Sequence, residues 1–235
     1  MKGLFANAGE SIVYTDKLEL PYLIPISFFK AYDNSKFEDN ISSGANGQLF
    51  LGLSSRNQIP KTHLYAQVFI DEIRVSSIFN ETKSRNQWAY QLGASITDVY
   101  FPGLTLNAEY TRVNPFVYQN FIPAQNYTNA KYPLGDWMGA NADRIYLSAF
   151  YKPHHKIGIK GFYMNSFKGW GGSVEQQYFA QPQPKFGFAP QFKLIQMGIE
   201  GYYQLYNNIQ IKFSHVNMAQ RPYLQVSKAN TITSF

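Results

Sequence analysis

The sequence predicts an all-β protein made of antiparallel strands. Three observations predict it: apolar and polar residues alternate in several segments, the connections between these segments alternate in length, and the composition is short of charge. Charged residues make up 15% of the 235 residues, against roughly 25% in soluble domains, whereas aromatic residues reach 17%. Because rings are favoured where a structure meets lipid headgroups, we expect an antiparallel transmembrane β-barrel of the outer-membrane type.

The alternation divides five segments into two faces, at residues 62–73, 87–97, 104–111, 144–151 and 194–206. One face is apolar, and the other carries Gln, Glu, Ser, Thr, Arg and Gly, which suits a wet lumen better than a dry core. Strands of about ten residues predict about ten strands in this length, in a barrel that is either closed or incomplete. The residues expected to face outward include Trp88, Leu92, Leu106, Leu147 and Ile199, and those expected to face inward include Gln87, Gln91, Thr105, Glu109 and Arg144.

The connections are expected to alternate between tight turns and long loops, as in outer-membrane barrels. Tight hairpins are predicted at residues 152–156 and 207–208, and long external loops at residues 113–142 and 166–190. We therefore expect one domain over residues 1–235, in which 1–46 form an irregular first part and 47–235 form a meander of antiparallel strands.

Aromatic residues recur at the predicted strand ends, where we expect them to form an interfacial girdle. The most apolar run, residues 18–29, is broken by Glu19, Pro21 and Pro25 and is too short for a spanning helix. A chain that crosses a bilayer without such helices requires a β-barrel. The predicted girdle residues are Tyr90, Tyr100, Tyr110, Tyr151, Tyr163 and Tyr203.

Enzymatic and nucleic-acid chemistry find little support. The net charge is +6, but the 21 Lys and Arg residues are spread singly, so we expect no nucleic-acid partner. The chain has no cysteine, and its four histidines lack metal-ligand spacing, so we expect no metal and no cofactor. No nucleophile or paired carboxylates stand in a catalytic context, and we expect no catalytic residue and no enzyme activity.

One stretch, KYPLGDWMGANADRIYLSAFYKP, joins a turn-rich loop to an abrupt alternation. With GESIVYTDKLELPYLIP and LYAQVFIDEI, it resembles the Wzi-type capsule assembly proteins of Bacteroidetes-like bacteria, over residues 9–163. The resemblance implies a bacterial outer-membrane barrel that holds capsular polysaccharide in a lectin-like way. Family members are longer, so this chain would correspond to the C-terminal half of one. The residues that match the family's loop pattern are Tyr132, Pro133, Leu134, Gly135, Gly139, Asn141, Ala142 and Asp143.

The sequence therefore predicts non-catalytic binding of capsular or another acidic polysaccharide at the cell surface. Loop rings would stack on sugars, and flanking cations would pair with uronate or phosphate groups. Outer-membrane lipid and lipopolysaccharide are the other expected partners. Two alternatives are a passive outer-membrane channel for small solutes or oligosaccharides and a soluble β-sandwich carbohydrate-binding module. The candidate carbohydrate-binding residues are Trp170, Trp137, Tyr132, Tyr118, Arg112, Lys131, Arg144 and Lys168.

Overall fold

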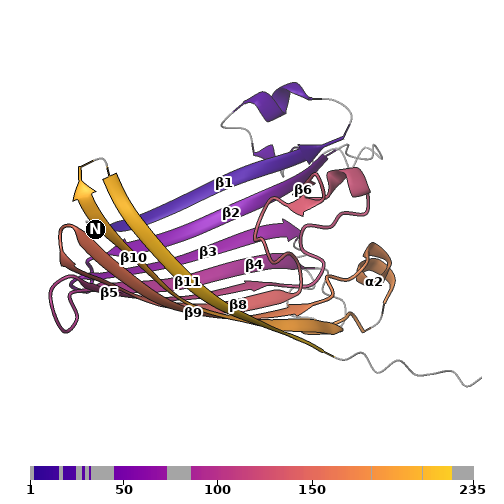
Figure 1. Ribbon diagram of the computed structural model, residues 1–235. Coiled ribbons are helices and arrows are strands. Elements are labelled where there is room, and N and C mark those ends of the chain that lie inside the picture. Colours follow the sequence, from indigo (N-terminus) through magenta and orange to yellow (C-terminus); the bar gives the residue numbers. More distant parts are fainter. Residues whose placement is uncertain are drawn as a thin grey trace, which may run out of the picture.

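One antiparallel sheet of nine strands dominates the fold (Figure 1). The computed structural model describes residues 3–15, 18–24, 28–29, 32, 45–72, 86–180, 182–207 and 209–223. The strands in sheet order are β1 (Leu4–Tyr14), β2 (Ala45–Arg56), β3 (Thr62–Glu72), β4 (Gln87–Thr97), β5 (Leu104–Val113), β8 (Ala142–His154), β9 (Ile157–Gly169), β10 (Pro190–Tyr206) and β11 (Ile209–Pro222).

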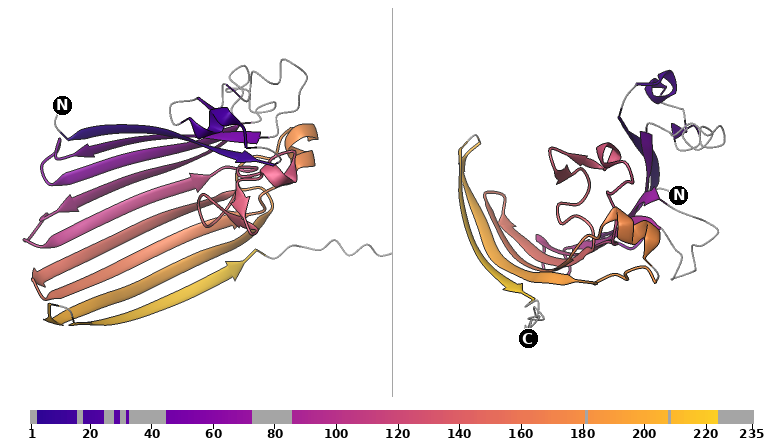
Figure 2. Two further views of the ribbon diagram at one scale, coloured as in Figure 1. Left: turned by 90° about the horizontal axis from the view of Figure 1, so that it is seen from above. Right: turned by 90° about the vertical axis from the view of Figure 1, so that its right-hand side faces the viewer.

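Each strand of this sheet pairs with the next strand of the sheet along the chain, so the fold is a meander. The prediction of an all-β, antiparallel protein is confirmed. Figure 2 shows that the sheet bends into a deep trough, with β1 and β11 along its two rims. Within the described residues β1 pairs only with β2 and β11 only with β10, so the sheet is open at both edges and does not close into a barrel.

Short helical turns and one small hairpin accompany the sheet. Among the described residues they include η1 (Leu20–Leu23), η3 (Pro123–Gln125), α2 (Val174–Phe179) and the paired strands β6 (Thr128–Asn129) and β7 (Tyr132–Pro133). Helix α2 begins with a capping box in which Ser173 accepts from the Gln176 amide, and the Gln176 side chain accepts in return. The described part of the chain contains no helix with the length and apolar character that crossing a bilayer requires.

The two faces of the sheet differ in polarity. The loop between β5 and β8 lies inside the trough and packs on Ala89 and Val113 (Figure 2). Ala89 and Val113 therefore point to the concave face, and so does every second residue along each strand from them, which we call the inward parity. Residues of the opposite parity therefore point outward from the convex face. These are the apolar residues expected to face outward, and many remain exposed: Leu53, Leu64, Trp88, Leu92, Leu147, Met197, Ile199, Ile211 and Phe213.

Glycines opposite aromatic residues help the sheet to bend. Tyr65 pairs with Gly93, Tyr202 with Gly158, and Phe162 with Gly198. In each pair the ring lies where a Cβ of the glycine would be, so only glycine allows the ring to lie flat across the neighbouring strand. Aromatic residues across glycines thus cover the concave surface while the sheet curves.

We expect Gly93→Val to lower the free energy of unfolding by about 1 to 3 kcal/mol, because the new side chain overlaps the Tyr65 ring. Urea titration in detergent micelles measures this loss. Gly161→Val is the matched control, since no atom lies within 4 Å of a Cβ built there. An equal loss in both variants would contradict the role of the ring contact.

The connections at the two ends of the sheet differ in length. At one end, residues 57–61, 98–103 and 155–156 join neighbouring strands by short turns, and only two residues separate β10 from β11. At the other end, residues 114–141 and 170–189 form long loops. We call these the first loop and the second loop, and we call this end of the sheet the loop end.

Two expected boundaries need correction. Strand β9 continues to Gly169, so the second loop begins after residue 166, because Ser166 pairs with Arg144 and Leu194. Strand β1 lies within residues 1–46, which the sequence analysis treats as irregular. The alternation of β1 is weak, because Glu10 lies among the outward, mostly apolar positions and Phe5 among the inward, mostly polar ones. Pairing with β2 along its whole length holds β1 in the sheet.

Candidate functional site

The first loop folds back into the trough rather than standing above it (Figure 2). Val117, Tyr118 and Ala140 form a small apolar core with Ala89 and Val113 of the sheet. Phe69 and Tyr127 pack against the same cluster. This core positions the exposed residues of the first loop, since the loop backbone is held against β4 and β5 at the loop end.

A buried carboxylate anchors the first loop. Asp71, at the end of β3, accepts hydrogen bonds from Asn46 Nδ2 at 3.1 Å, from Gln48 Nε2 at 3.4 Å and from the Tyr118 backbone N–H at 2.9 Å. Asn46 also donates to the Gln125 carbonyl at 3.4 Å. One side chain therefore joins two strands to the first loop, and it is 1% exposed.

Tyr118, one of the candidate stacking rings, belongs to this anchor. Its side chain is 5% exposed, and its hydroxyl accepts the Asp136 N–H at 2.9 Å. Burial raises the pKa of Tyr118 to about 12, so the hydroxyl stays protonated at neutral pH. Gly135 lies where any side chain would overlap this ring. The structure thus gives Tyr118 a supporting position, with almost no surface left for a sugar.

Asn141 ties the second loop to the first. Its Nδ2 donates to the carbonyls of Trp170 at 2.7 Å and Phe188 at 2.9 Å, and its Oδ1 accepts the Gly187 N–H at 2.8 Å. Asn141 has a φ of 55°, which Asn tolerates better than most residues. It is fully buried. Both loops are therefore fixed to each other just before β8 begins.

Asp143 lies on the convex face, because it pairs with Arg112 on the outward parity, and it accepts the Tyr110 hydroxyl at 3.1 Å. Asp143 was expected from the sequence to end the loop through side-chain to backbone hydrogen bonds, but in the structure Asn141 makes such bonds.

Arg144 is the centre of a charged network on the concave face. Its guanidinium lies 2.9 Å from Asp136 of the first loop and 3.4 Å from Glu109 of β5. Glu109 also accepts the Tyr65 hydroxyl at 2.6 Å. The Arg144 side chain is only 12% exposed. The guanidinium also lies 5.9 Å from the Trp137 ring centre, so the network holds that ring in place.

The other candidate cations fall into different surroundings. Lys168 faces the trough, and its Nζ donates to the Ala140 carbonyl at 2.5 Å. Lys131 is exposed in the turn between β6 and β7. Arg112 instead points outward, with its guanidinium 3.6 Å from the Phe186 ring centre. The structure therefore brings Arg144 and Lys168 to the concave face and separates Arg112 from them.

The exposed rings lie on the two loops. Trp137 is 59% exposed, Tyr132 76% and Trp170 42%. The Trp170 ring meets Phe188 edge to face at 6.1 Å. Two further rings on the same loops, Phe121 and Phe179, are exposed but are not among the candidate residues predicted from the sequence. Their position among Gly, Pro, Asn and Gln residues was the available signal.

No family model, curated protein or solved structure matches the chain. The resemblance to Wzi-type capsule assembly proteins therefore stays a prediction. The loops, their anchors and the two faces of the sheet are the observations on which a function can be argued.

In the described ranges, His, Cys, Asp and Glu side chains form no group of three that could hold a metal ion. The His154 and His155 rings lie 3.9 Å apart in the turn before β9, at the end of the sheet opposite the loops.

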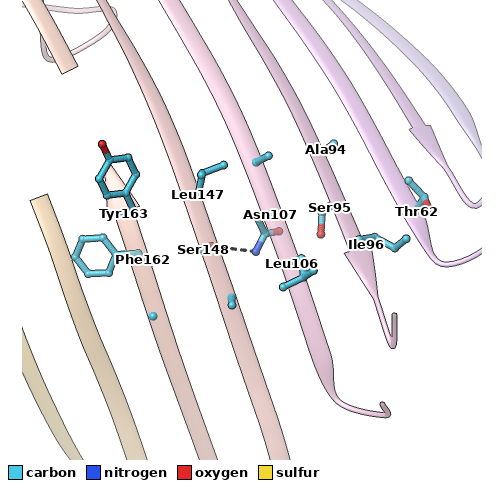
Figure 3. A pocket seen from close by; sticks show the side chains of 13 residues that line it. Thr62, Ala94, Ser95, Ile96, Leu106, Asn107, Leu147, Ser148, Phe162 and Tyr163 are labelled. Atoms are coloured by element: carbon cyan, nitrogen blue, oxygen red, sulfur yellow. Dashed lines mark hydrogen bonds between the residues drawn. The ribbon is translucent and has the colours of Figure 1, made fainter. Parts of the chain in front are cut away.

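The convex face carries a shallow apolar depression over its central strands. Figure 3 shows this region, which has a volume of about 680 Å³ and is lined by residues of β4, β5, β8 and β9. The depression forms because four of the outward residues there are small: Ala94, Ala108, Ala149 and Gly161. The hydrogen bond from Asn107 to Ser148 joins β5 to β8 on the polar parity. This hydrogen bond lies on the opposite face of the sheet from the small apolar residues that produce the depression.

Proposed function

We propose that this chain forms part of an outer-membrane β-barrel that binds capsular or another acidic polysaccharide at the bacterial cell surface, without catalysis. One observation carries the proposal: most exposed apolar residues of the strands line the convex face, whereas most polar strand residues and the folded loop occupy the concave face. A barrel in lipid requires this polarity, with apolar residues outward and polar residues inward.

The dimensions of the strands support the same placement. The nine strands of the large sheet contain 10 to 17 residues, and a transmembrane β-strand needs about 9 to 11. Outward rings lie toward both ends: Tyr90 and Tyr110 near the loop end, and Tyr151 and Tyr203 near the turn end. Tyr163 lies mid-strand opposite Leu147 and Met197, so it does not belong to either belt.

The loop end provides the proposed polysaccharide contacts. Trp137, Tyr132 and Trp170 present rings to solvent, and Lys131 and Lys168 supply positive charge beside them. Several weak contacts along a repeating polymer add up to strong retention without any single deep pocket. In this proposal Arg144 holds the Trp137 ring in position, and Tyr118 supports the first loop. Neither Arg144 nor Tyr118 contacts the sugar.

Two other functions are distinguished by specific observations. A soluble sandwich buries its apolar face under a second sheet. Within the described residues the second sheet is only the two-residue pair of β6 and β7, which leaves the convex face uncovered. A passive channel is favoured by the polar concave face, and ion conductance across planar bilayers tests for it.

The first experiment tests membrane placement. The chain is expressed with a signal peptide, and the outer-membrane fraction is run on gels with and without boiling. A change in migration on boiling is expected, because the proposed barrel, which this open sheet forms together with further strands, resists unfolding in detergent until heated. Folded, soluble protein without detergent would overturn the membrane proposal. Aggregated protein would overturn the assembly of this chain into such a barrel.

We expect Trp137→Ala and Trp170→Ala each to weaken polysaccharide retention about threefold to tenfold, because each removes one exposed ring. Pull-down of fluorescently labelled acidic polysaccharide by cells that display the protein measures this loss. Tyr100→Ala is the matched control, since Tyr100 is an exposed ring in the turn between β4 and β5, away from the loops. Equal losses in all three variants would contradict the proposed site.

A further inference from the structure

A row of residues that includes three cations crosses the mainly apolar convex face near the loop end. The row follows the strand register across β5, β8, β9, β10 and β11. At the regularly paired outward positions of the described strands, Lys and Arg occur in this row alone. Its members in order are Arg112, Asp143, Phe167, Lys193 and Arg221.

Two cations in this row face each other directly. Lys193 pairs with Arg221 across β10 and β11, and like charges directly opposite destabilise a sheet. Both side chains are exposed, and among the described residues neither forms an ion pair. Arg112, in contrast, lies opposite Asp143 and stacks on Phe186. The Lys193 and Arg221 pair therefore leaves a local excess of positive charge.

Aromatic rings surround this pair. Phe167 lies opposite Lys193 and contacts Phe186 at 5.9 Å and Tyr223 at 6.1 Å between ring centres. Rings of this kind favour the level of the headgroups in a bilayer, and cations at the same level attract anionic lipids. The apolar strand positions Ile195, Met197 and Ile199 continue from Lys193 toward the turn end, where acyl chains would lie.

We propose that Lys193 and Arg221, with the Phe167 and Tyr223 rings, bind the phosphate headgroup of an anionic lipid whose acyl chains lie along β10 and β11. This proposal rests on the membrane placement proposed above and adds a defined lipid site to it. An oxygen-rich phosphate between the two cations would replace their mutual repulsion by attraction. The site lies on the convex face, on the opposite side of the sheet from the polysaccharide loops.

The test uses the full chain with lipid vesicles. Flotation with phosphatidylcholine vesicles first measures membrane placement, and native mass spectrometry then compares retention of phosphatidic acid and phosphatidylcholine with the same acyl chains. We expect preferential retention of phosphatidic acid. Since each cation near an anionic surface contributes about fivefold, Lys193→Gln/Arg221→Gln is expected to retain about 25-fold less of it.

Arg56→Gln/Lys212→Gln is the matched control, because it removes the same charge from the concave face of the sheet. It is expected to retain phosphatidic acid like the wild type. An excess of inorganic phosphate should not displace the lipid, since free phosphate lacks acyl chains, and displacement would overturn the lipid assignment. Equal losses in both double variants, or no preference for phosphatidic acid in protein that floats, would overturn the site alone. Failure to float would overturn the membrane placement itself.

Discussion

Replacing Asp71 by alanine is expected to detach the first loop from the sheet and to lower the free energy of unfolding by about 3 to 5 kcal/mol. The Asp71 carboxylate accepts three hydrogen bonds from Asn46, Gln48 and the Tyr118 backbone in a buried site. Alanine leaves the Tyr118 N–H without an acceptor, and Asn46 and Gln48 keep only their bonds to the Gln125 and Asn46 carbonyls. Each lost hydrogen bond to a charged group costs about 1.5 to 3 kcal/mol. Urea titration in micelles measures the loss.

A local measurement separates loop release from general destabilisation. In Asp71→Ala, amide hydrogen exchange is expected to rise first in residues 114–141, because only this loop loses an anchor. Asp71→Asn keeps one oxygen acceptor and should recover part of the protection. Asp98→Ala is the control, since Asp98 is exposed and accepts one bond from Gly103 at 2.7 Å. Uniform exchange across all strands in Asp71→Ala would refute the anchor.

Replacing Arg144 by glutamine is expected to lower the free energy of unfolding by about 3 to 5 kcal/mol. The change leaves Asp136 and Glu109 facing the trough without the cation that they share, at 2.9 and 3.4 Å. Removing one partner from a poorly exposed charged group leaves an uncompensated charge, which costs more than the pair itself contributes. Polysaccharide retention should fall as well, because Trp137 loses its support.

The exposed pair of Lys61 and Asp98 provides the comparison. Their side chains are 57% and 41% exposed and lie 3.7 Å apart, so Lys61→Gln is expected to cost less than about 1 kcal/mol. The double variant Arg144→Gln/Glu109→Gln should recover part of the stability lost in Arg144→Gln, because it removes one of the unpaired carboxylates. No recovery would show that packing, rather than charge, sets the loss.

The faces of the sheet could be predicted because a period of two residues survives in the sequence wherever one face is apolar. The segment 87–97 shows this, with Trp88 and Leu92 outward and Gln87 and Gln91 inward. Strand β1 could not be predicted in the same way, because Phe5, Glu10 and Val13 interrupt its alternation. Its place in the sheet depends on pairing with β2, whose residues lie far along the chain. The curvature of the sheet could not be predicted from the sequence either, because each pair of an aromatic residue and a glycine forms only between two neighbouring strands.

The site could be predicted in its location but less in its residues. Long loops rich in Trp, Tyr and Gly pointed to the loop end. The burial of Tyr118 depends on Phe69 and Ala89 from other strands, which no local pattern indicates. The separation of Arg112 from Arg144 was available from parity, because Arg112 continues the outward set of Leu106 and Tyr110.

The nine described strands give the open sheet a direction as well as a shape. Nine is odd, so in this antiparallel meander β1 and β11 run the same way, and direct contact between the two rims would be parallel. A second copy turned about the trough axis would meet both rims in the same parallel sense. An antiparallel ring therefore requires an odd number of further strands, whose first and last members both run opposite to β1. This parity defines what any completing segment or partner must supply.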